Sequence, residues 1–158
     1  MGALITSFNI EHALPYDRLS QITHDLLGFA ISEGTVANKL AQMQRQAKGI
    51  IERIKRHVMD GPWMGSDETG TRVAGKKFWE WVWQSPLASY FVIDKRRGYD
   101  VVKEYFTERY TGVICHDCWC AQNQTPAGAH QLCHAHLLRH LQYAIDAQRS
   151  IWAYQVQR

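Results

Sequence analysis

Two acidic residues are the strongest candidates for chemistry in this chain of 158 residues. Asp67 lies in WMGSDETG, residues 63–70, and Asp117 follows the apolar run GVICH, residues 112–116. Closely spaced carboxylates repel one another unless a divalent cation lies between them, and Mg²⁺ prefers oxygen ligands. Such ions stabilise the attacking and leaving oxygens of phosphoryl transfer. Together the two acids indicate a metal site for phosphoryl transfer, although a single Asp at a strand end is more often a turn residue or a helix cap.

The elements that must position these acids follow from the periodicity of the apolar residues. Alternation with a period of two predicts strands, and three- and four-residue steps predict helices. The expected elements are strands over 63–73, 77–84 and 88–93, a helix after Arg97-Gly98 through Tyr110, strands over 112–116 and 130–133, and a helix from about 135 to 158. This order predicts an α/β fold with a mixed sheet: three antiparallel strands, a helix, further strands and a helix.

The two acids meet only if the first and fourth of these strands are neighbours. Both carboxylates would then lie on one side of the sheet, while Glu68, the next residue after Asp67, would face the other side. Trp79, Trp81 and Trp83 alternate along the second strand. We expect them to be core residues rather than a stacking platform for bases, because a mixed sheet needs one covered face.

A helical region over residues 1–61 is expected to precede a domain over 62–158. Apolar residues at helical spacing from Tyr16 end at Gly28, and Ser32 is a suitable N-cap for a longer helix that Pro62 stops. The two helices resemble a helix-turn-helix, and a plain helical hairpin with solvated basic residues explains the same pattern. We favour the hairpin, and non-specific phosphate contact remains open.

The composition excludes several classes of protein. With 46% hydrophobic and 21% charged residues the chain has the balance of a folded globular protein rather than a disordered one. It has no apolar run of about 18 residues and no signal peptide, so we expect a cytoplasmic protein without membrane contact. In that compartment the four cysteines are expected to be thiols or metal ligands, not disulfides.

A zinc site is the rival hypothesis. Cys115, Cys118, Cys133 and His136 have the spacing Cys-x2-Cys-x14-Cys-x2-His, which could hold a tetrahedral Zn²⁺. However, Cys115 and Cys118 flank Asp117 on an expected strand and its end, not on a knuckle that would let two thiolates converge. The expected cofactor is therefore Mg²⁺ or Mn²⁺, and zinc is disfavoured. If zinc does bind, Cys133 and His136 are the expected ligands.

Basic residues near the expected strand ends are candidates for contact with DNA phosphates. The candidates are Lys95, Arg96, Arg97, His136 and Arg139. For the run of three at 95–97, the alternative is a solvated turn between a strand and a helix, and we favour that alternative.

Several segments together resemble bacterial transposases of the insertion-sequence family numbered sixty-six. The matching segments are LPYDRLSQITHDLLGFAISEGTVANKL, WMGSDETGTRVAGKKFWEWVW, Arg97-Gly98, GVICHDCW and HQLCHAHLLRH, which run in the family's order from about residue 14 to 143. The resemblance implies a ribonuclease-H-like fold and an Asp, Asp, Glu triad that holds Mg²⁺. It further implies cutting of transposon ends and joining to target DNA, by a homo-oligomer of the complete transposase associated with the bacterial nucleoid. Asp67 and Asp117 match the first two acids, whereas Glu68 and Thr69 match the motif without a catalytic role.

The third acid of the triad has no clear counterpart. Glu108 is the last Glu, and Asp146 is the only acidic residue after Asp117. Asp146 could approach the two acids from a C-terminal helix, but the family's third acid lies well beyond it. We therefore expect a partial transposase, truncated before the third acid and without full strand-transfer activity alone. The alternative is a non-catalytic DNA-binding or assembly module, which zinc could stabilise.

Overall fold

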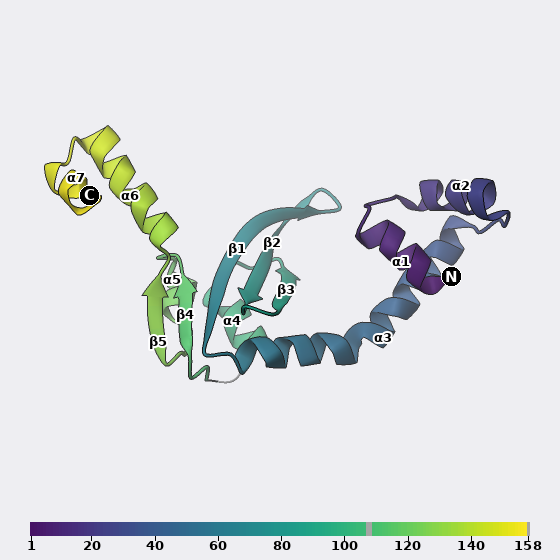
Figure 1. Cartoon of the computed structure of the whole chain (residues 1–158), viewed down its shortest axis with the longest axis horizontal. Coiled ribbons are helices and arrows are strands. Elements are labelled where there is room, and N and C mark those ends of the chain that lie inside the picture. The colour runs from purple at the N-terminus through teal and green to yellow at the C-terminus, as the bar shows by residue number, and fades with distance from the viewer. Residues whose placement is uncertain (107–108, 158) are drawn as a thin grey trace. The chain divides into compact units, whose positions relative to one another are not determined.

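The computed structural model describes residues 1–106 and 109–157 (Figure 1). The chain forms two compact units, Met1–Glu52 and Arg53–Arg158, which are considered separately. No helix in the described residues is both long enough and apolar enough to cross a lipid bilayer.

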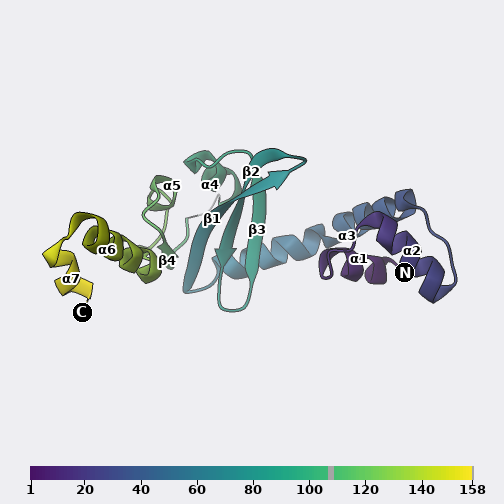
Figure 2. The ribbon, with the colours of Figure 1, turned by 90° about the horizontal axis from the view of Figure 1, so that it is seen from above.

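The first unit is helical, as the sequence predicts. It contains α1 (Gly2–Ile10), α2 (Tyr16–Leu27) and the first part of α3 (Glu33–Met59) (Figure 2). Gly28 ends α2 in the left-handed conformation, with a φ of 71°. At the start of α3 the Oγ of Ser32 accepts the backbone N–H of Thr35 at 3.1 Å, which confirms the predicted cap. The helix α1 was not predicted; it contributes Ile5 to a core that also contains Leu19 and Val36.

The second unit is built on a five-stranded mixed sheet in its described residues. The strands are β1 (Trp63–Val73), β2 (Lys76–Gln84), β3 (Ser89–Asp94), β4 (Val113–His116) and β5 (Ala129–Leu132). Their order across the sheet is β3-β2-β1-β4-β5. Antiparallel pairing joins β1 to β2 and β2 to β3, whereas β1 pairs with β4, and β4 with β5, in parallel. The predicted mixed α/β sheet and the neighbouring position of the first and fourth strands are confirmed.

The hairpin between β1 and β2 is closed by a two-residue turn at Ala74 and Gly75. Ala74 and Gly75 both have positive φ angles, 49° and 77°. A two-residue turn of this kind matches the right-handed twist of the strands that it joins. It sets the register in which Asp67 lies opposite Val82.

Two predicted helices have different bounds in the structure. The helix after Gly98 is α4 (Tyr99–Tyr105), and it ends before Tyr110. Phe106 leaves the helical conformation with φ −119° and ψ 64°, and its side chain is buried. Residues 107 and 108, which the prediction included, lie outside the described residues. Tyr110, the predicted last residue of this helix, lies instead in a loop, where it is buried and its hydroxyl donates to the Gly61 carbonyl at 2.7 Å.

The predicted C-terminal helix is two helices, α6 (His134–Gln148) and α7 (Ile151–Gln157). Arg149 takes a left-handed conformation with φ 50°, and its N–H and that of Ser150 bond to carbonyls of the last turn of α6. The break lets α7 pack on α6, with Leu141 and Ala153 both buried. The short helix α5 (Cys120–Asn123) was not predicted either.

The sheet has one covered and one open face. On the covered face Trp81 and Trp83 pack with Met64, with Val101 of α4 and with Ala121 of α5, so the predicted core role of these two tryptophans is confirmed. On the other face Asp67 is exposed, and Phe91 and Ile93 of β3 are 57% and 53% exposed. The side of β1 that carries Asp67 is therefore open to solvent and to ligands.

The turn after β3 gives a prediction about acid stability. Hydrogen bonds from the Arg96 side chain lower the pKa of Asp94 from 3.8 to about 2. A lowered carboxyl pKa contributes stability above pH 3.8 that is lost as the pH falls toward about 2.

We expect the difference in unfolding free energy between wild type and Asp94→Asn to be constant above roughly pH 5 and to shrink below roughly pH 4. The lowered pKa of Asp94 sets these limits. Urea titrations at several pH values measure it, and Asp100→Asn on the same segment is the control. A difference that does not change with pH would contradict this assignment.

Candidate active site

The parallel pairing of β1 with β4 brings Asp67 and Asp117 together. The register pairs Gly65 with Cys115, and each aspartate lies two residues further along its own chain. Because side chains alternate along a strand, a step of two residues keeps both on the face of Gly65 and Cys115. Neighbouring strands are about 4.8 Å apart, so the two side chains start from adjacent positions.

Both carboxylates line one pocket of about 260 Å³ on the open face. Its walls are residues 65–67 of β1, Val82 and Gln84 of β2, residues 115–117, and the residues Cys133 and His136 at the start of α6. The predicted meeting of the two acids thus has a physical basis in the structure.

Backbone amides fix one oxygen of each carboxylate. The Oδ1 of Asp67 accepts the N–H of Glu68 at 2.9 Å, and the Oδ1 of Asp117 accepts the N–H of Trp119 at 2.8 Å. Among the described residues no group donates to either Oδ2 atom. Each side chain therefore has a defined orientation and one oxygen free for a further ligand.

The backbone at Asp117 is held by a histidine pair. The Nδ1 of buried His116 contacts the Asp117 carbonyl, and its Nε2 lies 2.8 Å from Nδ1 of His130 on β5. Because a carbonyl can only accept, Nδ1 of His116 carries the proton, and His130 then donates to Nε2. The sequence showed both histidines but assigned neither of them.

The donors in the pocket suit a hard cation. Two carboxylates line it and no Lys or Arg does. Mg²⁺ is commonly held by one or two carboxylates together with waters and substrate phosphates. These features fit the predicted Mg²⁺ or Mn²⁺, with Asp67 and Asp117 as the ligands.

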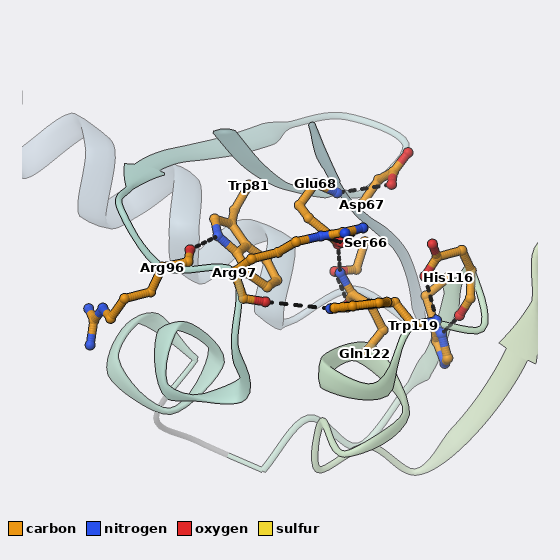
Figure 3. Close-up of polar contacts among 10 residues, drawn as sticks. Ser66, Asp67, Glu68, Trp81, Arg96, Arg97, His116, Trp119 and Gln122 are labelled. Atoms are coloured by element: carbon orange, nitrogen blue, oxygen red, sulfur yellow. Dashed lines mark hydrogen bonds and ion pairs between the residues drawn. The ribbon is translucent and has the colours of Figure 1, made fainter. Parts of the chain in front are cut away.

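Glu68 faces the opposite side of β1, as predicted, and is buried there with only 1% of its side chain exposed. Its Oε2 accepts from Gln122 at 2.8 Å, and Gln122 in turn accepts from Ser66 at 2.6 Å (Figure 3). Its Oε1 lies 3.0 Å from Nη2 of Arg97. Burial raises the pKa of Glu68, while the hydrogen bonds from Gln122 and Arg97 lower it.

Arg97 is stacked between two tryptophans. The centre of its guanidinium lies 4.4 Å from the Trp79 ring and 3.9 Å from the Trp119 ring. Sequence reasoning missed the roles of Trp119, Ser66 and Gln122. The short helix that carries Gln122 was not predicted, so no pattern placed Gln122 under β1.

The other predicted phosphate contacts are placed differently. Arg96 bonds Asp94 at 2.8 Å and Glu104 at 2.5 Å, so Arg96, like Arg97, has an acidic partner within the chain. Lys95 is exposed, with its Nζ 5.8 Å from the Phe78 ring. His136 lines the pocket, and Arg139 is exposed on α6. Contact of any of these residues with DNA stays a prediction.

The residues of the zinc hypothesis do not form one cluster. Cys115, Cys133 and His136 line the pocket, whereas Cys118 is exposed and does not. Within residues 1–106 and 109–157 no group of three or more His, Cys, Asp or Glu side chains is placed to hold one metal ion. Asp146 is exposed on α6, accepts from Gln142 at 2.9 Å, and does not line the pocket.

A second pocket lies in the first unit and has a different character. It has a volume of about 570 Å³ and lies between α1, the start of α2 and α3. Its walls include Ile10, Leu40 and Met43, and no Asp, Glu, His, Cys, Lys or Arg lines it. Unlike the pocket of Asp67 and Asp117, it has no pair of carboxylates for a metal ion, so the pocket of Asp67 and Asp117 is the candidate active site.

Comparison with known proteins identifies the family of the chain. The family model for transposases of the IS66 family matches residues 1–158, the whole of the sequence. The chain belongs to the IS66 family of transposases. The resemblance inferred from the motifs around Asp67 and Asp117 is thereby confirmed. No curated protein matches the chain.

Cys133, the N-cap of α6, is predicted to be the more reactive of the two cysteines that line the pocket of this IS66-family protein. The His136 side chain and the backbone N–H groups of His136 and Ala135 lower the pKa of the Cys133 thiol, whereas burial raises the pKa of Cys115. The thiolate is the reactive form of cysteine. In a Cys118→Ser/Cys120→Ser background, iodoacetamide at neutral pH should therefore label Cys133 before Cys115.

Mass spectrometry of timed samples measures this order. Adding His136→Gln should move the midpoint of Cys133 labelling to higher pH, because the hydrogen bond by which the His136 side chain stabilises the thiolate is lost. Faster labelling of Cys115, or a midpoint unchanged by His136→Gln, would contradict the described environment.

Proposed function

We propose that the chain carries the metal-binding half of a DDE-type catalytic centre for DNA transposition, with Asp67 and Asp117 as the metal ligands. We further propose that residues 62–158 form a ribonuclease-H-like catalytic domain. The observation that carries the proposal is that both carboxylates line one open pocket from neighbouring parallel strands. Membership of the IS66 family supports DNA as the substrate.

The fold assignment is supported by the order of the elements. Three antiparallel strands, a helix, a parallel strand, a short helix, a further parallel strand and a helix follow one another in the second unit. This is the arrangement that the family resemblance implies. The first unit, with its helices and basic residues, would precede the catalytic domain as a helical region.

When bound, Mg²⁺ or Mn²⁺ would neutralise charge on a phosphate and stabilise the attacking and leaving oxygens. The residues of the chain supply the position. Asp67 and Asp117 each keep one oxygen free while a backbone N–H holds the other. The His116 ring fixes the carbonyl of Asp117. Among the described residues no Lys or Arg lines the pocket, so no permanently charged side chain competes with a cation for the two carboxylates.

A complete DDE centre needs a third carboxylate. No described residue supplies one to the pocket, since Asp146 is exposed elsewhere on α6. We therefore propose that these 158 residues bind metal through two carboxylates and do not perform strand transfer by themselves. The alternative function is a non-catalytic DNA-binding or assembly module.

A titration with Mn²⁺ tests the proposal. Free Mn²⁺ is measured by electron paramagnetic resonance in the presence of wild type, Asp67→Asn or Asp117→Asn. Each substitution should weaken binding by about tenfold or more, because it removes one of two carboxylate ligands from a site that depends on both. Asn keeps the shape and can still accept the backbone N–H, so the fold should be retained.

Asp146→Asn is the matched control, because it removes an exposed acid from the same unit without touching the pocket. Its Mn²⁺ affinity should equal that of wild type. Binding that neither Asp67→Asn nor Asp117→Asn weakens would refute the catalytic proposal. DNA binding that persists in the absence of such a metal site would then favour the non-catalytic module.

A further inference from the structure

The buried group beneath β1 connects the two aspartates to each other. Glu68 follows Asp67 directly, and the backbone N–H of Glu68 is the donor that holds Asp67 Oδ1. The Glu68 side chain is fixed on the other face by Arg97, whose Nε and Nη2 both lie 3.0 Å from Oε1. The contact of Arg97 with the Glu68 side chain therefore also helps to fix the backbone N–H of Glu68, which donates to Asp67.

The second connection runs through Trp119. Its backbone N–H holds Asp117 Oδ1 at 2.8 Å, and its ring stacks 3.9 Å from the Arg97 guanidinium. The Nε1 of Trp119 also lies 3.5 Å from the Arg97 carbonyl oxygen. Trp119 is 40% exposed, so its position depends strongly on this stacking (Figure 3).

Arg97 therefore touches the two residues whose amides orient the two carboxylates. We propose that Arg97 is a positioning residue of the active site, which clamps Glu68 and Trp119 and so fixes Asp67 and Asp117 relative to one another. The inference rests on the proposed function, because the arrangement matters for metal binding. It also gives Glu68, which matched the family motif without a role, a specific task.

The charges of the group are consistent with this role. Without Arg97, the carboxylate of Glu68 would be buried without a compensating charge. A guanidinium is suited to the task, because its flat fork can bond a carboxylate while both of its faces stack on aromatic rings.

Arg97→Gln and Arg97→Lys test the proposal. In both variants the dissociation constant for Mn²⁺ should rise about tenfold or more, the range seen when the partners that orient metal ligands are removed. Lysine should not restore affinity, because its ammonium cannot stack flat between Trp79 and Trp119. Full affinity in Arg97→Lys would show that charge alone is sufficient and would overturn the clamp.

A loss of stability must be distinguished from a loss of positioning. Val102→Ala, a truncation in the buried core of the same unit, is the control, with unfolding measured in urea for every variant. It should destabilise the chain and leave Mn²⁺ affinity unchanged in the folded state. If Val102→Ala weakens Mn²⁺ binding as much as Arg97→Gln does, Arg97 has no specific role.

Amide hydrogen exchange provides a second test of the proposal, one that does not depend on metal binding. The amides of Glu68 and Trp119 should exchange faster in Arg97→Gln than in Val102→Ala, because their local contacts open. If wild type shows no Mn²⁺ binding that depends on Asp67, the proposed function fails and this test alone decides the inference. Unchanged exchange of both amides in Arg97→Gln would overturn it.

Discussion

The parallel register of β1 on β4 is the constraint on which the candidate site depends. Gly65 pairs with Cys115, and the two aspartates each follow at a distance of two residues. Side chains alternate along strands, so a slip of one residue would send Asp67 and Asp117 to opposite faces. Buried neighbours on both strands resist that slip, because Met64 and Ile114 are paired and each is fully buried on the covered face. Apolar packing on the covered face thus fixes the positions of Asp67 and Asp117 on the open face.

Burial of the polar cluster under β1, which contains Glu68, Arg97 and Gln122, has an unfavourable desolvation free energy that other interactions must offset. A buried carboxylate loses its hydration, and an ion pair repays that loss only with good geometry and further hydrogen bonds. Glu68 has both, since Arg97 and Gln122 bond different oxygens and Ser66 completes the chain. An apolar residue at this position would be equally easy to bury. It would not connect the strand of Asp67 with the loop of Asp117. The benefit of Glu68 is therefore a more specific arrangement of the site rather than a more stable fold.

Sequence patterns were sufficient for the sheet and for the two aspartates, because both depend on local periodicity and strand ends. The bounds of β1 and the placement of Asp67 and Glu68 on opposite faces follow from alternation. The network of Glu68, Arg97, Trp119 and Gln122 does not, because its members come from three separate segments, β1, the turn after β3 and the start of α5, and meet only through tertiary packing. Arg97 in particular read as a solvated basic turn, since no local rule indicates that two distant indole rings enclose it. The break at Arg149 was missed for a related reason: only the packing of α7 on α6 favours a left-handed arginine there.

The placement of Arg97 also decides what the open face can bind. Had its side chain projected toward Asp67 and Asp117, it would have satisfied both carboxylates and excluded a cation. Instead its charge is matched by Glu68 on the covered face, and the pocket has two acids and, among the described residues, no Lys or Arg in its walls. A pocket of that composition attracts divalent cations and, through them, phosphate groups. The same strand therefore separates two charge environments: the buried ion pair of Glu68 with Arg97 on the covered face, and two aspartates on the open face that we propose as metal ligands.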